Sequence, residues 1–182
     1  MLDSILADRE LVVLQLKFVT MFIVSRLLAG ANILSTEWII EVIYLLLGLA
    51  TYSLIIKKFI PKDINNKHIK SVINVNALYG TMLIVSRLLS GNDFTAEWMN
   101  SVVYILLGFT TYNIVIKDLI PFNKFKDSKI KHAINDSLEI FVMSIVSQFL
   151  SGKTYNSMWF YSTLYTSSGF IVYHLLISSI LS

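Results

Sequence analysis

The sequence predicts an all-α integral membrane protein, a six-helix bundle made of three tandem transmembrane hairpin repeats with pseudo-threefold symmetry. Composition is the first observation: the 182 residues are 55% hydrophobic and only 15% charged, whereas soluble domains carry about 25% charged residues. The second is a series of apolar stretches long enough to cross a bilayer as helices. The third is a motif that recurs at intervals of 61 residues, beginning at Ile23, Ile84 and Ile145.

The repeated motif has three parts that keep their order and spacing. IVSRLLAG, IVSRLLSG and IVSQFLSG begin the three copies; STEW, TAEW and NSMW follow them; YLLLGLATY, YILLGFTTY and YTSSGFIVY end them. Matching periods of this kind indicate repeat architecture. We therefore predict a single transmembrane domain over residues 1–182. Its repeats are assigned to residues 10–60, 72–120 and 133–181.

Each repeat holds two apolar stretches, which predict one helical hairpin. The first helices are predicted at residues 10–29, 72–90 and 134–151. The second helices are predicted at residues 36–59, 96–119 and 157–180. A glycine follows each first helix (Gly30, Gly91, Gly152), where a left-handed cap is common. Pro61 and Pro121 end the second helices of the first two repeats, because proline cannot continue a helix.

The lysines and arginines predict the orientation of the bundle. Twelve of the fifteen lie near the termini and in the loops between repeats, and three lie at the hairpin tips. Because cytosolic loops carry the excess of basic residues, both termini are expected on the cytosolic side. No cleavable signal peptide is recognised at the N-terminus. The basic loops 57–70 and 117–132 are expected to meet anionic lipid headgroups or an acidic protein partner.

Two arginines near the hairpin tips predict structural ion pairs. Arg26 and Arg87 lie about one turn before the hairpin tip in the first helix of their hairpins. Glu37 and Glu97 begin the next helix of the same hairpin. The third repeat has an uncharged residue at both positions, so the two charges disappear together. We interpret them as partners, within a hairpin or between neighbouring repeats. The functional alternative is an ion-binding ring at the outer mouth, against which the loss in the third repeat argues.

A stripe of tyrosine, glycine and tyrosine lies four residues apart on each second helix, and therefore on one face. Its members are Tyr44, Gly48 and Tyr52; Tyr104, Gly108 and Tyr112; and Tyr165, Gly169 and Tyr173. Small residues let helix backbones approach closely in lipid. The stripe is predicted to be a helix-packing surface. The alternative is a narrow central path faced by the tyrosine hydroxyls.

Two further acids stand out because charge inside a membrane is costly. Glu41 follows Trp38 by one turn and has serine at the equivalent positions of the other repeats. It is the candidate ion or proton site, with pairing to Arg26 or Arg87 as the alternative. Lys17 and Glu139 hold equivalent positions in the first and third repeats and are candidates for a pair that closes the bundle.

Signals of catalysis and of cofactor or metal binding are absent from the sequence. There is no cysteine, no catalytic motif and no carboxylate cluster with di-metal spacing, and the three histidines are far apart. We therefore expect no catalytic residue, no cofactor and no metal. Nucleic acid is not expected as a partner, because the basic residues adjoin apolar spans.

The motif also carries a resemblance to a class of proteins. IVSRLLSG at Ile84–Gly91, followed by Glu-Trp and a LLGF-x-x-Tyr run, resembles small multi-pass membrane proteins encoded by large double-stranded DNA viruses, the giant viruses. The resemblance covers all three copies and implies a setting, a virion internal membrane or a host endomembrane, with no activity attached.

Together these features predict a non-enzymatic structural membrane protein. It would link a virion internal membrane to the capsid, with capsid proteins or further copies of itself as partners. The alternative is a small channel or carrier with a path near Glu41 and the tyrosine stripes. A dry bundle centre favours the first function, and a continuous polar path favours the second.

Overall fold

The chain is helical throughout the part that the structure describes. The computed structural model describes residues 2–61 and 63–180. Lys62, one of the twelve lysines and arginines used to predict the orientation, and residue 181 of the third repeat lie outside the described residues. All the regular elements within these ranges are helices. The all-α class predicted from the sequence is confirmed.

Six long helices form three consecutive pairs. They are α1 (Leu2–Leu28), α2 (Thr36–Leu54), α3 (Lys67–Leu89), α4 (Ala96–Thr111), α5 (Ser128–Leu150) and α6 (Ser157–Val172). Short elements continue the second helix of each pair: η1 (Ile56–Phe59), η2 (Tyr112–Ile116) with η3 (Lys117–Leu119), and η5 (Tyr173–Ile177) with α7 (Ser178–Ile180). A further short turn, η4 (Phe122–Lys124), lies in the loop before α5.

The second helices of the pairs keep the predicted bounds, whereas the first helices begin five to eight residues before the predicted starts. For α3 and α5 the difference comes from polar capping. The side chain of Asn66 accepts hydrogen bonds from two backbone N–H groups in the first turn of α3, and Asp127 does the same for α5. These caps satisfy orphan donors and so extend each helix beyond its apolar stretch.

Each hairpin turn begins at a glycine in the left-handed region. The φ angles of Gly30, Gly91 and Gly152 are +67°, +68° and +64°. A side chain would be strained in this conformation. The predicted left-handed caps are therefore confirmed.

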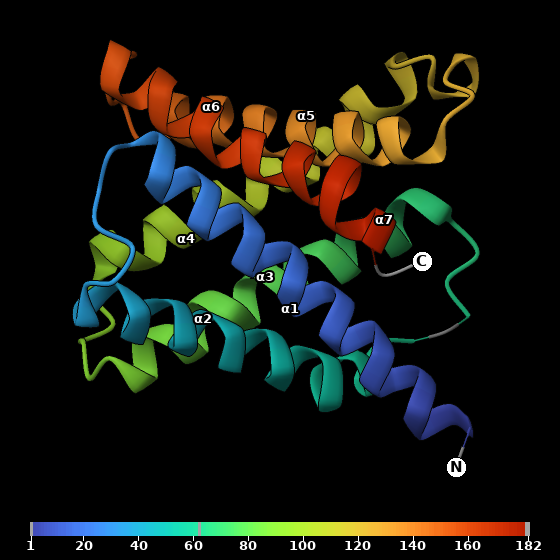
Figure 1. Ribbon diagram of the computed structural model, residues 1–182, viewed down its shortest axis with the longest axis horizontal. Coiled ribbons are helices and arrows are strands. Elements are labelled where there is room, and N and C mark those ends of the chain that lie inside the picture. The colour runs from blue at the N-terminus through green and yellow to red at the C-terminus, as the bar shows by residue number, and fades with distance from the viewer. Residues whose placement is uncertain (1, 62, 181–182) are drawn as a thin grey trace.

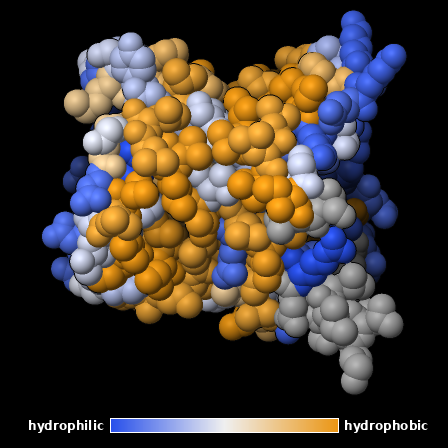
Figure 2. Space-filling model, in the orientation of Figure 1, coloured by the Kyte–Doolittle hydropathy of each residue, from blue (hydrophilic) through white to orange (hydrophobic). Residues whose placement is uncertain are grey.

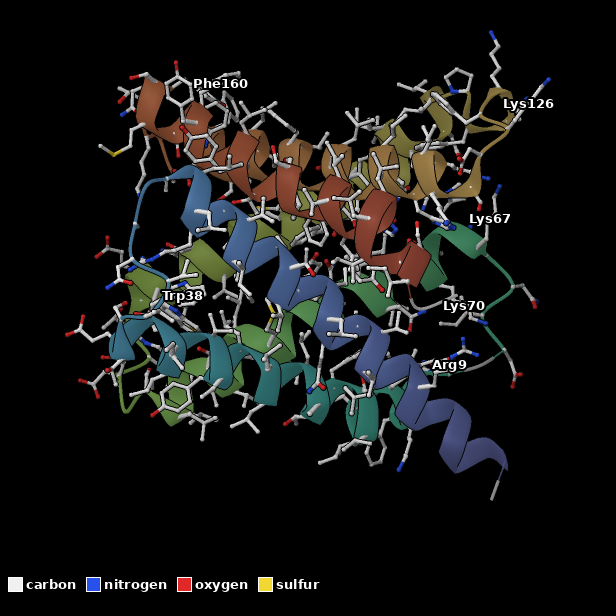
Figure 3. All side chains as sticks on the ribbon, viewed as in Figure 1. Arg9, Trp38, Lys67, Lys70, Lys126 and Phe160 are labelled. Carbon is white, nitrogen blue, oxygen red and sulfur yellow. The ribbon has the colours of Figure 1, made fainter. Side chains whose placement is uncertain are left out.

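The helices run between two distinct ends of the molecule (Figure 1). The tip end carries the hairpin loops 29–35, 90–95 and 151–156. The terminal end carries both chain termini and the loops 60–66 and 120–127. Arg9, Lys67, Lys70 and Lys126 lie at the terminal end, and Trp38 and Phe160 lie at the opposite one (Figure 3).

The closest helix contacts join one hairpin to the next. A Cβ placed on Gly48 of α2 would lie 2.6 Å from the Cα of Met82 in α3. Gly108 of α4 makes the same approach to Met143 of α5, also at 2.6 Å.

The last hairpin meets the first in the same way. Gly169 of α6 abuts the backbone of Met21 in α1, so the second helix of each hairpin packs against a first helix and the last packs against the first. These three glycines and three methionines are hereafter the glycine layer.

The core is built from positions that recur in the repeats. Phe18, Tyr79 and Ile140 are equivalent in the sequence, as are Leu49, Phe109 and Phe170. Together with Met21 and Met82 they form one buried cluster. Tyr79 stacks on Phe109 with ring centroids 3.8 Å apart. Large apolar side chains thus fill the middle of the bundle.

The face of the molecule shown in Figure 2 is largely apolar between the two ends. Large exposed hydrophobic side chains lie on all six long helices. Five helices of the described residues are long and apolar enough to cross a membrane: Arg9–Leu28, Thr36–Phe59, Lys67–Leu89, Ala96–Leu119 and Ser128–Leu150. The predicted sixth span, 157–180, is helical but falls outside this set, because it carries eight serine and threonine residues.

Candidate functional site

The arginines at the hairpin tips bind loop carbonyls instead of the predicted glutamates. Arg26 donates from Nε to the carbonyl oxygen of Asn32 at 3.2 Å, and Arg87 donates from Nε and from a terminal nitrogen to that of Asp93 at 3.0 and 2.7 Å. In the third repeat Gln148 donates to the carbonyl of Thr154 at 2.7 Å. The acceptor lies six residues after the donor in every case.

This geometry corrects the predicted ion pairs Arg26–Glu37 and Arg87–Glu97, neither of which forms among the described residues. Both glutamates are exposed to solvent. Each arginine instead lies over a tryptophan of its own hairpin, with Trp38 at 5.7 Å and Trp98 at 5.4 Å from the guanidinium carbon. Carbonyls and an aromatic face stabilise the cation without a carboxylate.

Glu41 lies on the surface of the tip end, in a recess of about 510 Å³ between α2 and α3. Glu37, Tyr44 and Arg87 line the same recess, yet none of the ion pairs of the described residues includes Glu41. A recess of about 410 Å³ occupies the equivalent place between α1 and α6, and it carries no charged side chain. Glu41 lies about two helical turns from Leu49 of the apolar core on the tip side, whereas Asp136 lies one turn from Ile140 of the core on the terminal side.

The second tyrosine of each stripe reaches an equivalent position of another hairpin. Tyr52 donates to the Asn74 side chain at 3.5 Å, and Tyr112 donates to that of Asn135 at 3.0 Å. Tyr173 donates to the backbone carbonyl of Val13 at 3.3 Å. All three tyrosines are buried, so the hydroxyls are used in contacts between helices.

The first tyrosines of the stripes, Tyr44, Tyr104 and Tyr165, are partly exposed. Tyr44 and Tyr165 line the two tip-end recesses. The first and third stripes thus run from a recess at the tip end, past the glycine layer, to a hydrogen bond on the terminal side.

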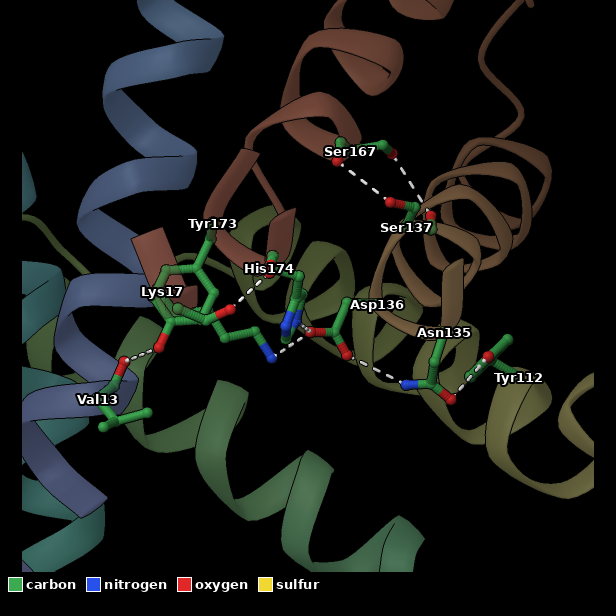
Figure 4. A network of polar contacts seen from close by, with 10 residues as sticks. Val13, Lys17, Tyr112, Asn135, Asp136, Ser137, Ser167, Tyr173 and His174 are labelled. Atoms are coloured by element: carbon green, nitrogen blue, oxygen red, sulfur yellow. Dashed lines mark hydrogen bonds and ion pairs between the residues drawn. The ribbon is translucent and has the colours of Figure 1, made fainter. Parts of the chain in front are cut away.

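A cluster of ionisable side chains is buried on the terminal side of the core (Figure 4). The Lys17 ammonium on α1 forms an ion pair with Oδ2 of Asp136 on α5, and Nε2 of His174 in η5 lies 2.7 Å from the same oxygen. The side chains of Asp136 and His174 are 12% and 13% exposed. This cluster joins the first helix to the last hairpin.

Sequence reasoning placed the partner of Lys17 one turn too far along the helix. Lys17 and Glu139 were candidates for a pair, but Asp136 is the partner of Lys17, three residues earlier on the same face of α5. Glu139 instead accepts a hydrogen bond from the Asn113 side chain at 2.7 Å. The signal that could have revealed Asp136 was its position one helical turn before Glu139, since both face the bundle.

Two π-helical segments, η2 and η5, present the partners of these acids. They occupy equivalent places in the second and third repeats, and Asn113 and His174 are their second residues. A π-helical turn inserts an extra residue, which shifts the side chains that follow it, and such turns are frequent at functional sites. Equivalent positions thus supply an amide to Glu139 and an imidazole to Asp136.

The cluster borders a cavity of about 430 Å³ between α1, α5 and η5. Its lining includes Lys17, Lys129, His132 and His174. The residues that the structure describes contain no group of three or more acidic or histidine side chains placed to hold a metal ion.

The fold and the site define a helical protein. Five of its described helices are long and apolar enough to cross a membrane, and a buried ionisable cluster lies at one side of its core. Comparison with family models, with curated proteins and with solved structures finds no match.

Proposed function

We propose that the chain is a structural, non-enzymatic integral membrane protein, with six spans in three hairpin repeats arranged around a pseudo-threefold axis. The five apolar helices and the exposed apolar side chains support membrane embedding, because soluble proteins rarely expose contiguous patches of this kind.

The hydroxyl groups of α6 support its assignment as the sixth span. Ser167 and Thr166 donate to the carbonyls four residues earlier in the same helix. Thr163 shares a hydrogen bond of 2.7 Å with Ser144 of α5. Polar groups that are satisfied inside the protein are tolerated within a bilayer.

The pseudo-threefold arrangement is supported by the glycine layer. The same pair of sequence positions meets at each contact between hairpins, including the contact of the last with the first. The second tyrosines make hydrogen bonds at equivalent positions as well.

The proposed orientation places the terminal end on the cytosolic side. Twelve of the fifteen lysines and arginines belong to this end by sequence position, which is the bias that sets orientation. The basic loops 57–70 and 117–132 would then face anionic headgroups or an acidic protein partner, which in a virion would belong to the capsid. The viral setting is supported by the motif resemblance alone.

The single observation that carries the structural role is the filled centre. Phe18, Phe109 and Phe170 are 1% exposed and Leu49 is fully buried. This cluster separates the recess that holds Glu41 from the ionisable cluster on the terminal side. A solute path past Glu41 and the tyrosines would have to displace these side chains.

Flux across a reconstituted membrane tests this proposal. The purified protein is placed in liposomes, and ion and small-solute flux is measured for the wild type and for Glu41→Gln. We expect both to equal protein-free liposomes. Flux that exceeds this level and falls in the variant would contradict a scaffold and place a pathway beside Glu41.

One observation favours the second candidate, a small channel or carrier. Intramembrane lysine, aspartate and histidine side chains often mark proton or ion pathways, and Lys17, Asp136 and His174 form such a cluster. Proton flux that is lost in Asp136→Asn but kept in Glu41→Gln would support this candidate.

A further inference from the structure

The cavity beside the ionisable cluster reaches from the terminal end into the bundle. Glu10 and Lys17 both line it, and they lie two helical turns apart on α1. Lys129 and His132 of α5 and Ser178 beyond η5 line the opposite wall. Its volume of about 430 Å³ leaves room for a small polar group.

Two lysines and a histidine supply hydrogen-bond donors to this cavity. A lysine ammonium has three N–H groups. The contacts of Lys17 are the ion pair with Asp136 and the face of the Phe170 ring, and Lys129 donates to Ser179 at 2.9 Å. His132 stacks on His174 with ring centroids 5.7 Å apart, and its ring nitrogens make no hydrogen bond to the described residues.

The acids around the cavity are already engaged by other groups. Glu10 accepts from Lys57 at 2.6 Å at the exposed rim. Asp136 uses Oδ2 for Lys17 and His174, and its Oδ1 accepts from Asn135 at 3.1 Å. The two lysines keep N–H groups that these acids do not use, and an anion with several oxygens would match them.

The equivalent place between the second and third repeats is balanced instead. There Glu139 stands at the position of Lys17 and Asn113 at that of His174, and the two side chains bond each other. Ser71 donates to the same asparagine at 2.7 Å. The place between the second and third repeats thus pairs its acid with an amide, unlike the contact between the last hairpin and the first.

We propose that this cavity binds a phosphate group, with Lys17, Lys129 and His132 as its donors. The inference rests on the proposed membrane embedding, which puts the mouth of the cavity at the depth of lipid headgroups. Basic pockets between membrane helices on the cytosolic side hold anionic headgroups in this manner. The phosphate is that of an acidic phospholipid or a free phosphate anion.

Thermal unfolding in an uncharged detergent tests the site with defined probes. The full-length protein is titrated with short-chain phosphatidic acid, short-chain phosphatidylcholine or inorganic phosphate. We expect phosphatidic acid to raise the melting temperature in a saturable manner and phosphatidylcholine, whose phosphate is masked by choline, to have little effect. A response to inorganic phosphate as well would identify a free anion as sufficient; a response to phosphatidic acid alone would identify a lipid.

Two rim variants locate the site without removing the buried ion pair. Lys129→Gln removes the ammonium charge and His132→Ala removes the imidazole N–H, so each should weaken the apparent affinity for phosphatidic acid by about tenfold. Lys126→Gln removes an exposed lysine of the same end that does not line the cavity, and it should leave the affinity unchanged.

The inference is overturned if no probe raises the melting temperature, or if all three variants weaken binding equally. A flotation assay separates this failure from failure of the proposed function. Protein that floats with liposomes after alkaline washing but binds no phosphate would contradict the cavity alone. Protein that stays soluble without detergent or lipid would contradict the membrane assignment on which both depend.

Discussion

The glycine layer and the neighbouring cluster of Lys17, Asp136 and His174 differ in how well their residues are repeated along the chain. In the glycine layer the same two residue types meet at all three contacts between hairpins. Toward the terminal end, the position of Lys17 is leucine in the second repeat and glutamate in the third. Where helix backbones touch, only glycine fits, so the repeats are alike. Where side chains fill the space between helices, the residues differ from one contact to the next. The contact of the last hairpin with the first contains the ion pair between Lys17 and Asp136.

The largest effect is expected from breaking the ion pair at that contact. Lys17→Met leaves the Asp136 carboxylate with His174 and Asn135, and should lower the free energy of unfolding by about 3 kcal/mol. The matched control is Leu78→Met, an apolar exchange at the equivalent position, with a cost below about 1.5 kcal/mol. Both are measured by denaturing-detergent titration in mixed micelles.

The double variant Lys17→Met/Asp136→Leu sharpens this prediction. Asp136 is equivalent to Leu14 and Val75, so leucine suits the position. We expect the second change to recover most of the lost stability, because no uncompensated charge remains. Additive losses would show that the two side chains act independently.

A smaller effect is expected in the glycine layer. Gly169→Ala drives a methyl group into the backbone of Met21, which cannot be relieved by a rotamer change, and should cost about 2 kcal/mol. Gly80→Ala is the control, because its added methyl would lie 3.8 Å from a Leu106 side chain, an ordinary contact. It should be neutral or stabilise by up to about 1 kcal/mol through helix propensity. Equal losses in the two variants would contradict the close backbone approach.

The hydroxyls of the second tyrosines should contribute less to the free energy of unfolding than the glycine layer does. Tyr112→Phe removes the hydrogen bond to Asn135 and should cost about 1 kcal/mol in the same titration. Tyr104→Phe, at the partly exposed first position of the stripe, should change stability by less than half of that. An equal cost at both positions would count against a packing role specific to the second tyrosine.

The smallest effect is expected at the hairpin tips. Arg87→Gln recreates the residue that already binds the loop carbonyl in the third repeat, so its melting temperature should stay close to that of the wild type. Glu97→Gln should also leave the melting temperature close to that of the wild type, because Glu97 is exposed and has no arginine partner. A large loss in Glu97→Gln would restore the ion-pair interpretation.

Much of the fold could be predicted because the repeats and the apolar stretches are both visible in the linear sequence. The bounds of the second helices, the left-handed glycines and the stripe positions were predicted from three aligned copies, whereas the starts of the first helices were placed five to eight residues too late. The arginine partners were not, because the acceptors are backbone carbonyls, which every residue carries and no sequence pattern marks. The partner of Lys17 was misplaced by one turn for a related reason: spacing identifies the face of a helix but not the height at which a side chain of another helix meets it.

The central claim is that the last hairpin closes on the first, and cross-linking tests it directly. The chain has no cysteine, so Ser25→Cys/Ser162→Cys adds the only thiols, on α1 and α6 at the recess they share. A short bis-maleimide is applied in liposomes, and the chain is then cut at a protease site inserted in loop 60–66. We predict that the two fragments stay joined, whereas those of Ile40→Cys/Ser162→Cys separate, because Ile40 lies in the N-terminal fragment but lines the recess between α2 and α3. Separation of the fragments in the first variant, under conditions in which both thiols react with a single maleimide, would contradict a closed bundle.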